Sequence, residues 1–287
     1  MALQFVRIKL SLCALLFLLS GVAAAASAAT PSAATPLVLG VHPYLPATTL
    51  VKRFTPLVTY LSEALQRPVT LRIGSSYRDH IDAVGQKRVD IGFFGPAIYL
   101  VLVRDYGPQP LLGRLSFKGG KSSFQGVIFT RKNSPIQTLA ALKGKRFAFG
   151  DANSTMSSQV PKALLRQAGV EENQLGFYKH MKNHHNVALG VLLGKYDAGG
   201  AKEEVFWEYQ SRGLRALKWS PPFVSHAFVA NRDLPSTLRQ QLQKWLLTVH
   251  EHPRAVEILE GIKAETKRII PVEESDFDSL RTLLSMP

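Results

Sequence analysis

Residues 147–169 read FAFGDANSTMSSQVPKALLRQAG and join a short strand, a hydroxyl-rich loop and a helix. The first three residues are apolar and predict the strand. The helical pattern after the loop ends at Gly169, a residue that favours a left-handed C-terminal cap. Pro161 is tolerated in a first helical turn but not in a helix interior, so we expect the helix to begin near Ser157 or Ser158.

The loop before this helix predicts an anion-binding site. It holds four hydroxyl side chains in five positions, namely Ser154, Thr155, Ser157 and Ser158. The first N–H groups of a helix have no partner inside it, and the helix dipole places partial positive charge there. One serine is enough to cap a helix, and four hydroxyls exceed that need. We therefore expect Ser154 and Thr155 to lie in the loop, where this cluster could bind a small anion; the alternative is that these serines only cap the helix.

The N-terminal segment has the pattern of a secretory signal peptide. Arg7 and Lys9 precede the apolar run 10–19, and small residues follow up to residue 28. We expect residues 1–28 to be removed and the mature protein to be exported to a bacterial periplasm. Cys13 is the only cysteine and lies inside this segment, so we expect a mature protein without disulfides that relies on a conventional core.

Composition narrows the possible partners. The chain has 287 residues, is 46% hydrophobic and 20% charged, and carries a formal net charge of +14. These proportions are ordinary for a globular protein of one large or two moderate domains. The positive charge favours anionic ligands, whereas export argues against nucleic acid as a partner. No run of five basic residues occurs, so most of these side chains are expected to solvate the surface.

The first part of the mature chain predicts a parallel α/β arrangement. Residues 37–41, 69–73 and 89–95 have the apolar or alternating patterns of strands. Between them, apolar residues at helical spacing along 50–65 and a shorter pattern at 78–86 predict helices. Two β-α-β units in succession imply parallel strands with helices packed on them.

The same order repeats in a second block. We expect one α/β lobe from residues 37–123 and 231–287, a second from 131–220, and two crossing strands at 124–130 and 221–230. Such a two-lobed fold has a ligand cleft between the lobes and can close by hinge motion. Ligands of open α/β sheets lie beyond the carboxyl ends of the strands. Those ends lead into the loops 42–49, 75–78, 94–99, 151–158 and 199–204.

From residue 37 to residue 281 the chain resembles a known family, the phosphate/phosphite/phosphonate-binding proteins of ABC importers. The order and spacing of several segments carry the resemblance: LGVHPYLP, FTPLVTYLSEAL, SSYRDHID, VDIGFFGPAIY, LAALKGKRFAFGDANSTMSSQVP and HHNVALGVLLGKYDAGG. The family consists of periplasmic receptors with the type II, two-lobed periplasmic binding fold. The resemblance implies that fold, a small phosphorus oxyanion as ligand, and an ABC permease in the inner membrane as partner.

The resemblance also implies the ligand-binding residues. In the family, the hydroxyl loop of the second lobe, tyrosines of the first lobe and one histidine hold the oxyanion. The matching positions here are Tyr77, Tyr99, Ser154, Thr155, Ser157 and His184. His185 is adjacent, but the distance to Gly194, which we expect to cap the helix at 187–193, favours His184. Met156 departs from the family pattern, where many relatives have serine, and either Ser157 or Ser158 could supply the missing donor.

Two further positions have alternative interpretations. Tyr44 lies in the first of the expected loops and could line the cleft. Glu203 could pair with a ligand amine and select an aminophosphonate, but the pattern favours a solvated run of charges formed by Lys202, Glu203 and Glu204. Neutral donors suit an oxyanion receptor, since a fixed cation would bind more kinds of anion.

Motifs for catalysis are incomplete. The segment KGGKS at 118–122 resembles a phosphate-binding P-loop, but Leu115 stands where the motif needs glycine. His180 and His184 lack the glutamate of a zinc hydrolase. We therefore expect no enzyme activity, no cofactor and no metal. The expected function is a periplasmic solute-binding protein that delivers a phosphonate, phosphite or phosphate to an ABC importer; the alternative is a sensor that signals to a membrane kinase or cyclase.

Overall fold

Two β-α-β units open the described chain, which comprises residues 35–286 of the computed structural model. The expected signal peptide, residues 1–28, lies outside the described residues. Both predicted units are present. In chain order they consist of β1 (Leu37–Val41), α1 (Ala47–Leu65), β2 (Val69–Ile73), α2 (Tyr77–Gly85) and β3 (Ile91–Phe94).

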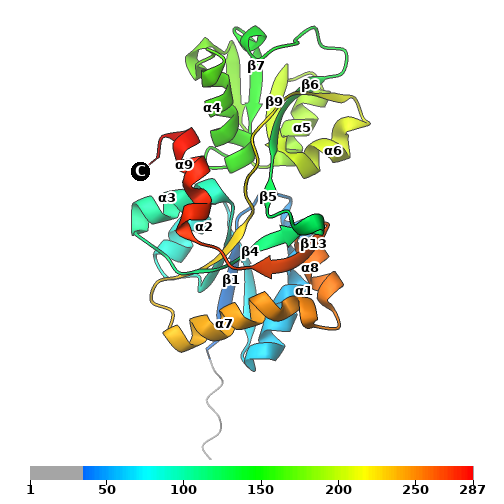
Figure 1. Cartoon of the computed structure of the whole chain (residues 1–287). Helices are drawn as coiled ribbons and strands as arrows, with labels where there is room; N and C mark the ends of the chain where they lie inside the picture. Colours follow the sequence, from blue (N-terminus) through cyan, green and yellow to red (C-terminus); the bar gives the residue numbers. More distant parts are fainter. Residues whose placement is uncertain (1–34, 287) are drawn as a thin grey trace, which may run out of the picture. The chain divides into compact units, whose positions relative to one another are not determined.

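The first lobe is built on a six-stranded sheet. Its strand order is β13-β4-β12-β3-β1-β2, with β1 paired in parallel to both β2 and β3. α1 packs on this sheet with its predicted apolar face. The buried residues of that face are Leu50, Phe54, Leu57 and Leu61. The lobe occupies the lower half of Figure 1.

The segment after β3 differs from the prediction. It forms α3 (Pro96–Tyr106) and then β4 (Leu111–Phe117), neither of which the sequence patterns indicated. Gly95 is the N-cap of α3 and Pro96 its first residue, a favoured order at a helix start. Residues 96–102 are all buried, so the helix has no polar face there and lacks the periodicity that would have identified it.

The second lobe contains a five-stranded sheet of order β10-β6-β9-β7-β8. The predicted cap residues Gly169 and Gly194 have φ values of 73° and 72°, as a left-handed cap requires. β8 was not predicted from the sequence. The strands are β6 (Gly126–Arg131), β7 (Arg146–Phe149), β8 (Phe177–His180), β9 (Ala198–Lys202) and β10 (Leu214–Trp219), and the helices are α4 (Val160–Gln167), α5 (His184–Leu192) and α6 (Glu203–Gln210).

A two-stranded ribbon joins the lobes. β5 (Ser123–Phe124) pairs with β11 (Phe223–Val224) in antiparallel orientation, and belongs to neither large sheet. After β11 the chain enters the first sheet as β12 (Ala227–Ala230). The sequence predicted one continuous strand here, but Ser225 and His226 separate the two short strands.

The C-terminal part completes the first lobe and contacts the second. α7 (Ser236–Thr248), α8 (Ala255–Ile262) and β13 (Thr266–Ile270) pack on the first sheet or join it. The last helix, α9 (Asp278–Leu284), contacts α3 of the first lobe and α4 of the second. Figure 1 shows it beside the junction of the lobes.

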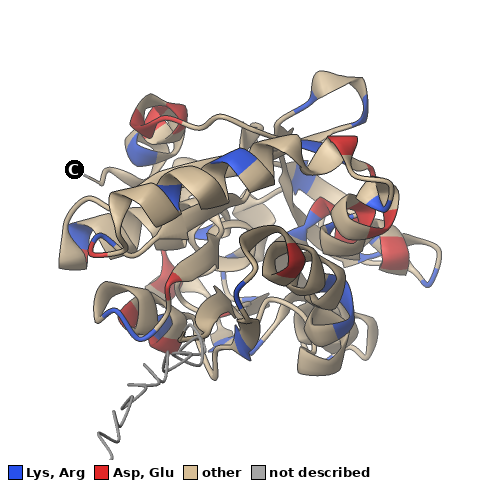
Figure 2. Cartoon of the chain, turned by 90° about the horizontal axis from the view of Figure 1, so that it is seen from below, with Lys and Arg blue, Asp and Glu red and all other residues tan. Residues whose placement is uncertain are grey.

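Charged side chains are spread over the surface. Figure 2 shows Lys and Arg on several helices and loops, with Asp and Glu between them. This distribution agrees with the absence of a long basic run in the sequence. Among residues 35–286, no helix is both long enough and apolar enough to cross a membrane.

Candidate functional site

A small buried cavity lies between the lobes, where several strands of both sheets end. Its volume is about 10 Å³, which is room for a single water molecule. Both lobes and the connecting ribbon contribute to its wall. The lining residues are His42, Tyr44, Tyr77, Gly95, Ile98, Phe124, Ser154, Thr155, Met156, His184, Lys202 and His226.

A second hollow is much larger than this cavity. An open groove of about 800 Å³ lies beside the cavity, and Phe124 belongs to the wall of both. This groove, called the outer groove below, is wide and partly open to solvent. Polar side chains converge on the smaller cavity. We place the candidate site in the cavity because convergent donors, and not size, determine the binding of a small anion.

Five helices begin at the cavity. Tyr77 is the first residue of α2, Gly95 the N-cap of α3, Thr155 the start of the turn before α4, His184 the first residue of α5, and Lys202 the N-cap of α6. Each helix start carries N–H groups without intrahelical partners and the positive end of a dipole. Their convergence gives the cavity a positive potential without requiring a charged side chain.

The hydroxyl loop enters its helix through a widened turn. Residues 155–159 are π-helical, and the Val160 N–H donates to the Thr155 carbonyl five residues earlier. Pro161 explains the wide turn, because it has no N–H for the carbonyl of Ser157, which accepts the Gly150 N–H at 2.8 Å instead. The helical geometry thus begins at Thr155, and the predicted start near Ser157 or Ser158 is wrong by two to three residues.

Hydrogen bonds fix the hydroxyls of Ser154 and Thr155. The Ser157 hydroxyl donates to Ser154 Oγ at 2.8 Å, and the Ala97 N–H donates to Thr155 Oγ1 at 3.0 Å across the two lobes. Each oxygen already accepts a hydrogen bond, so its own hydrogen is free to be donated into the cavity. Both residues are almost fully buried.

His184 presents a further donor next to Ser154. Its Nδ1 accepts the backbone N–H of Lys202 at 3.0 Å, which leaves the proton of the neutral ring on Nε2. Nε2 lies 3.4 Å from Ser154 Oγ. Burial, with the nearby Lys202 charge, holds the pKa of His184 well below its ordinary value, so the ring is neutral.

Two more histidines line the cavity on the first-lobe side. The rings of His42, His226 and Phe93 are nearly parallel, with His226 centred 5.7 Å from His42 and 5.0 Å from Phe93. The Nδ1–H of His42 donates to the Phe93 carbonyl at 2.9 Å, so its Nε2 is an acceptor. Burial lowers the pKa of His42 to about 3, and that of His226 well below its ordinary value.

Lys202 is the charged residue of the wall. Its side chain is 3% exposed, and its Nζ lies 2.7 Å from Glu204 and 4.4 Å from the centre of the Tyr44 ring. Glu204 also pairs with Arg53 of the first lobe at 2.7 Å. Burial lowers the pKa of Lys202 to about 8. Burial opposes the charged form of Glu204 as well, but the two cations outweigh it and lower the pKa of that carboxyl.

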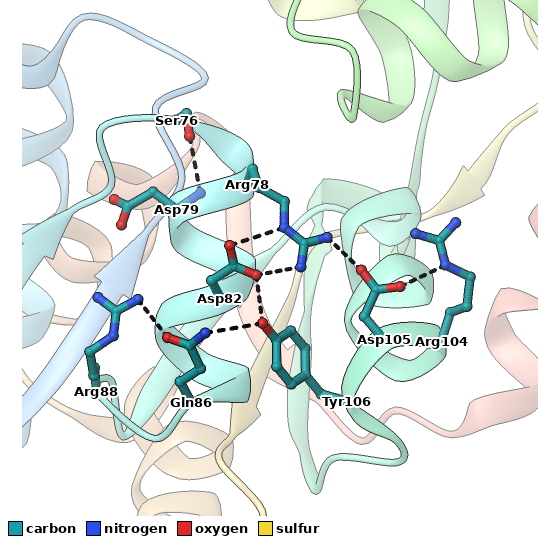
Figure 3. A network of polar contacts seen from close by, with 9 residues as sticks. All are labelled: Ser76, Arg78, Asp79, Asp82, Gln86, Arg88, Arg104, Asp105 and Tyr106. Carbon is teal, nitrogen blue, oxygen red and sulfur yellow. Dashed lines mark hydrogen bonds and ion pairs between the residues drawn. The ribbon is translucent and has the colours of Figure 1, made fainter.

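A polar network holds α2 and α3 together, and with them the helix starts that carry Tyr77 and Gly95 (Figure 3). Arg78 of α2 pairs with Asp82 one turn later and with Asp105 of α3. The Tyr106 hydroxyl of α3 donates to Asp82 at 2.7 Å. These contacts connect the two helices, and Arg78 directly follows the cavity residue Tyr77.

The structure brings most of the predicted residues together. Tyr44, Tyr77, Ser154, Thr155 and His184 line the cavity, and the neighbouring His185 instead contacts the Tyr209 hydroxyl at 3.1 Å. Ser157 lies behind Ser154 and positions it. Ser158 points away and donates to the Gly150 carbonyl at 3.2 Å. Neither serine therefore places a hydroxyl where Met156 replaces the family's serine, since Met156 itself lines the wall.

Tyr99 and Glu203 do not reach the cavity. Tyr99 was expected on a turn, but it lies inside α3, where its hydroxyl contacts Glu274 and its ring lies 4.5 Å from that of Phe277. The expectation that it faces the cleft is wrong. Glu203 lines the outer groove and pairs with Lys263 at 3.3 Å. The alternative of a solvated charge run is also wrong for Lys202, which is buried.

Sequence reasoning missed several residues of the wall. His42 and Lys202 fall in loops that were expected at strand ends, so their place in the chain could have identified them. No signal marked His226, because it lies between β11 and β12, where one continuous strand was expected. Among residues 35–286, no three His, Cys, Asp or Glu side chains are grouped as metal ligands.

Fold and cavity together define a two-lobed protein of the binding-protein class, with a polar cavity between its lobes. A family model described as "ABC transporter, phosphonate, periplasmic substrate-binding protein" matches residues 39–277. The chain therefore belongs to this family of periplasmic substrate-binding proteins of ABC transporters. The resemblance identified from the sequence segments is confirmed.

Individual relatives are distant in sequence but cover most of the chain. The probable ABC transporter phosphite binding protein PhnD1 of Prochlorococcus marinus is 26% identical over 78% of this chain and 83% of its own. The phosphate-import protein PhnD of Mycolicibacterium smegmatis is 23% identical over 79% and 78%.

Solved structures confirm the two-lobed fold. The structure of PhnD1 in complex with methylphosphonate has a TM-score of 0.75 and 24% identity, and covers 86% of this chain and 96% of its own. A binding protein component of an ABC phosphonate transporter from Pseudomonas aeruginosa has a TM-score of 0.79 and 17% identity, over 86% and 85% of the two chains.

Proposed function

We propose that the cavity binds a small phosphorus oxyanion (a phosphonate, phosphite or phosphate) and that the protein delivers it to an ABC permease in the inner membrane. The observation that carries this proposal is the start of five helices at one cavity. Oxyanions are bound by such helix starts through backbone N–H groups and the helix dipole. The named relatives bind phosphite, phosphate or methylphosphonate, which supports this ligand class.

The side chains add donors suited to an oxyanion. Ser154 and Thr155 each have a hydroxyl hydrogen to give, and His184 has its Nε2–H. The hydroxyl of Tyr77 is a further donor, because burial raises its pKa and keeps it protonated. Three or four donors placed around one point can replace the hydration shell of a tetrahedral anion.

Binding requires the lobes to move apart and close again. A cavity of about 10 Å³ is too small for a phosphorus atom with its oxygens, so the walls must separate before the ligand enters. The β5–β11 ribbon is the connection about which we propose that this motion occurs. A closed form with a buried ligand would be the form presented to the permease.

We further propose that residues 1–28 are a cleaved signal peptide and that the mature protein works in the periplasm. The basic start, the apolar run and the small residues before the cleavage region support this. The family is one of periplasmic proteins, which is consistent with export.

Calorimetric titration with matched variants tests the proposal. The mature protein, freed of carried-over ligand, would be titrated with phosphite, methylphosphonate, phosphate and sulfate. We expect tight binding of at least one phosphorus compound. Removing one hydrogen bond to a charged ligand costs about 1.5–3 kcal/mol, so Ser154→Ala and Tyr77→Phe should each weaken it about 10- to 150-fold.

Two variants of the same chemistry serve as controls. Ser158→Ala and Tyr99→Phe remove hydroxyls that point away from the cavity. They should leave the affinity within about twofold of the parent. Equal losses in the control and test variants would contradict the proposed site, and a folded protein that binds none of the phosphorus compounds would contradict the proposed function.

A further inference from the structure

Lys202 gives the wall of the cavity a positive charge that no lining carboxylate balances. Of the described residues that line it, Lys202 alone carries a full charge, and no carboxylate belongs to the wall. The three lining histidines are held neutral by burial, and the Lys202 charge contributes to the lowered pKa of each. A ligand in the cavity therefore faces a cation and neutral donors.

The carboxylate next to Lys202 already forms two ion pairs. Glu204 lines the outer groove and lies between two cations, at 2.7 Å from Lys202 and 2.7 Å from Arg53. One negative and two positive charges leave this group of three side chains with a net positive charge. Glu204 is thus unable to receive a ligand ammonium unless it gives up one of its present partners.

Glu203 does not provide a carboxylate partner for a ligand ammonium group either. Its carboxylate pairs with Lys263, and Glu203 lines the outer groove and not the cavity. An ammonium group carried on a short carbon chain would have to lie beside Lys202 without a carboxylate partner. A charge that is buried without a partner makes the free energy of binding less favourable by a large amount.

We propose that Lys202 makes the cavity selective for phosphorus oxyanions whose substituent has no positive charge, and that aminoalkylphosphonates are rejected. This inference rests on the proposed function of the cavity. Hydrogen, hydroxyl, methyl and short alkyl substituents place no charge against Lys202. Its ammonium also strengthens binding of the oxyanion itself, so one residue both attracts the anion and excludes the amine.

Two ligands of equal size separate charge from shape. Ethylphosphonate and aminomethylphosphonate have the same number of heavy atoms, and only the second carries an ammonium group. Their affinities for the mature protein at pH 7 would be measured by competition against methylphosphonate. We expect the parent protein to prefer ethylphosphonate about a hundredfold or more.

Variants of Lys202 assign the preference to this residue. Lys202→Met keeps the length of the side chain without its charge; it should weaken methylphosphonate binding about tenfold or more and reduce the preference to less than about tenfold. Lys202→Arg keeps the charge and should keep most of the preference. Lys263→Met removes a lysine of the outer groove and should leave the preference unchanged, and thermal unfolding would show that each variant is folded.

The outcomes distinguish this inference from the proposed function. Binding of methylphosphonate with equal affinity for the two test ligands would overturn the selectivity and leave the function standing. A strong preference that persists in a folded Lys202→Met variant would overturn the role of Lys202. Failure of methylphosphonate and of the other phosphorus compounds to bind the parent would overturn both.

Discussion

The substitution Gly150→Ala tests how the fold positions the hydroxyl loop. A methyl group at this position would lie 1.8 Å from Ser157 Oγ and 2.6 Å from Ser157 Cβ. Atoms that are not bonded do not approach so closely, so Ser157 must move. The Ser157 hydroxyl is the donor that fixes Ser154 Oγ at 2.8 Å, and the displacement therefore reaches the binding site.

The size of the effect follows from these contacts. Overpacking costs about 1–3 kcal/mol, and loss of the hydrogen bond between the two serines about 1 kcal/mol more, so Gly150→Ala should destabilise by about 2–4 kcal/mol. Ser157→Gly should cost about 2 kcal/mol, because it loses the same hydrogen bond and places glycine in a helical turn. In that background the nearest Ser157 atom to the new methyl is Cα at 3.8 Å, an ordinary contact.

A double-mutant cycle provides the assay. Urea unfolding of the parent, Gly150→Ala, Ser157→Gly and the double variant would give four free energies of unfolding. We expect the double variant to be about as stable as Ser157→Gly alone, which corresponds to a coupling of about 2 kcal/mol or more. Oxyanion affinity should fall in all three variants, since each disturbs the partner of Ser154. Additive losses of stability would refute the proposed contact.

Two further predictions concern protons and lobe closure. Burial lowers the pKa of His42 to about 3 and that of His226 well below 6.5, so the unfolded chain binds more protons below pH 6.5 and stability should fall as the pH drops from there toward 3. The loss from His42 alone is about 2 kcal/mol at pH 5, and His226 adds to it in the same direction. Urea unfolding at several pH values measures it, and a flat profile from pH 7 to 5 would contradict it. Arg53→Ala removes a pair that joins the lobes, Arg53 to Glu204 at 2.7 Å, and should favour the open form and weaken oxyanion binding about 3- to 10-fold. Small-angle scattering of the unliganded variant checks this, and a radius of gyration equal to the parent's would argue against it.

Local sequence patterns predicted most elements of the fold. α1 was identified because a single apolar stripe packs on the sheet, as the burial of Leu50, Phe54 and Leu57 shows. Glycine at 169 and 194 marked two helix ends, because only a residue that tolerates positive φ fits there. α3 was missed for the opposite reason, since its first turns are buried on all sides and show no periodicity.

The candidate site was predicted in part. The hydroxyl loop, Tyr77 and His184 were found because helix starts and the family pattern are local features of the sequence. Tyr99 was placed in the cleft wrongly, because the direction of a side chain on a buried helix depends on what the helix packs against, here Glu274 and Phe277. Those partners are more than 170 residues away and leave no trace in the local sequence.

By itself, the sequence determined the fold class and the family and located the hydroxyl loop before its helix, since these depend on periodicity, caps and residue order within short segments. Only the tertiary structure decided which charges face the ligand. Lys202 follows a strand in a run with Glu203 and Glu204 that looks like solvated surface, yet it is buried in the cavity wall while Glu203 lies in the outer groove. The reason is that residues 202–204 stand where β9 ends and α6 begins, and their partners are distant in sequence: Glu204 pairs with Arg53 and Glu203 with Lys263, both of the other lobe.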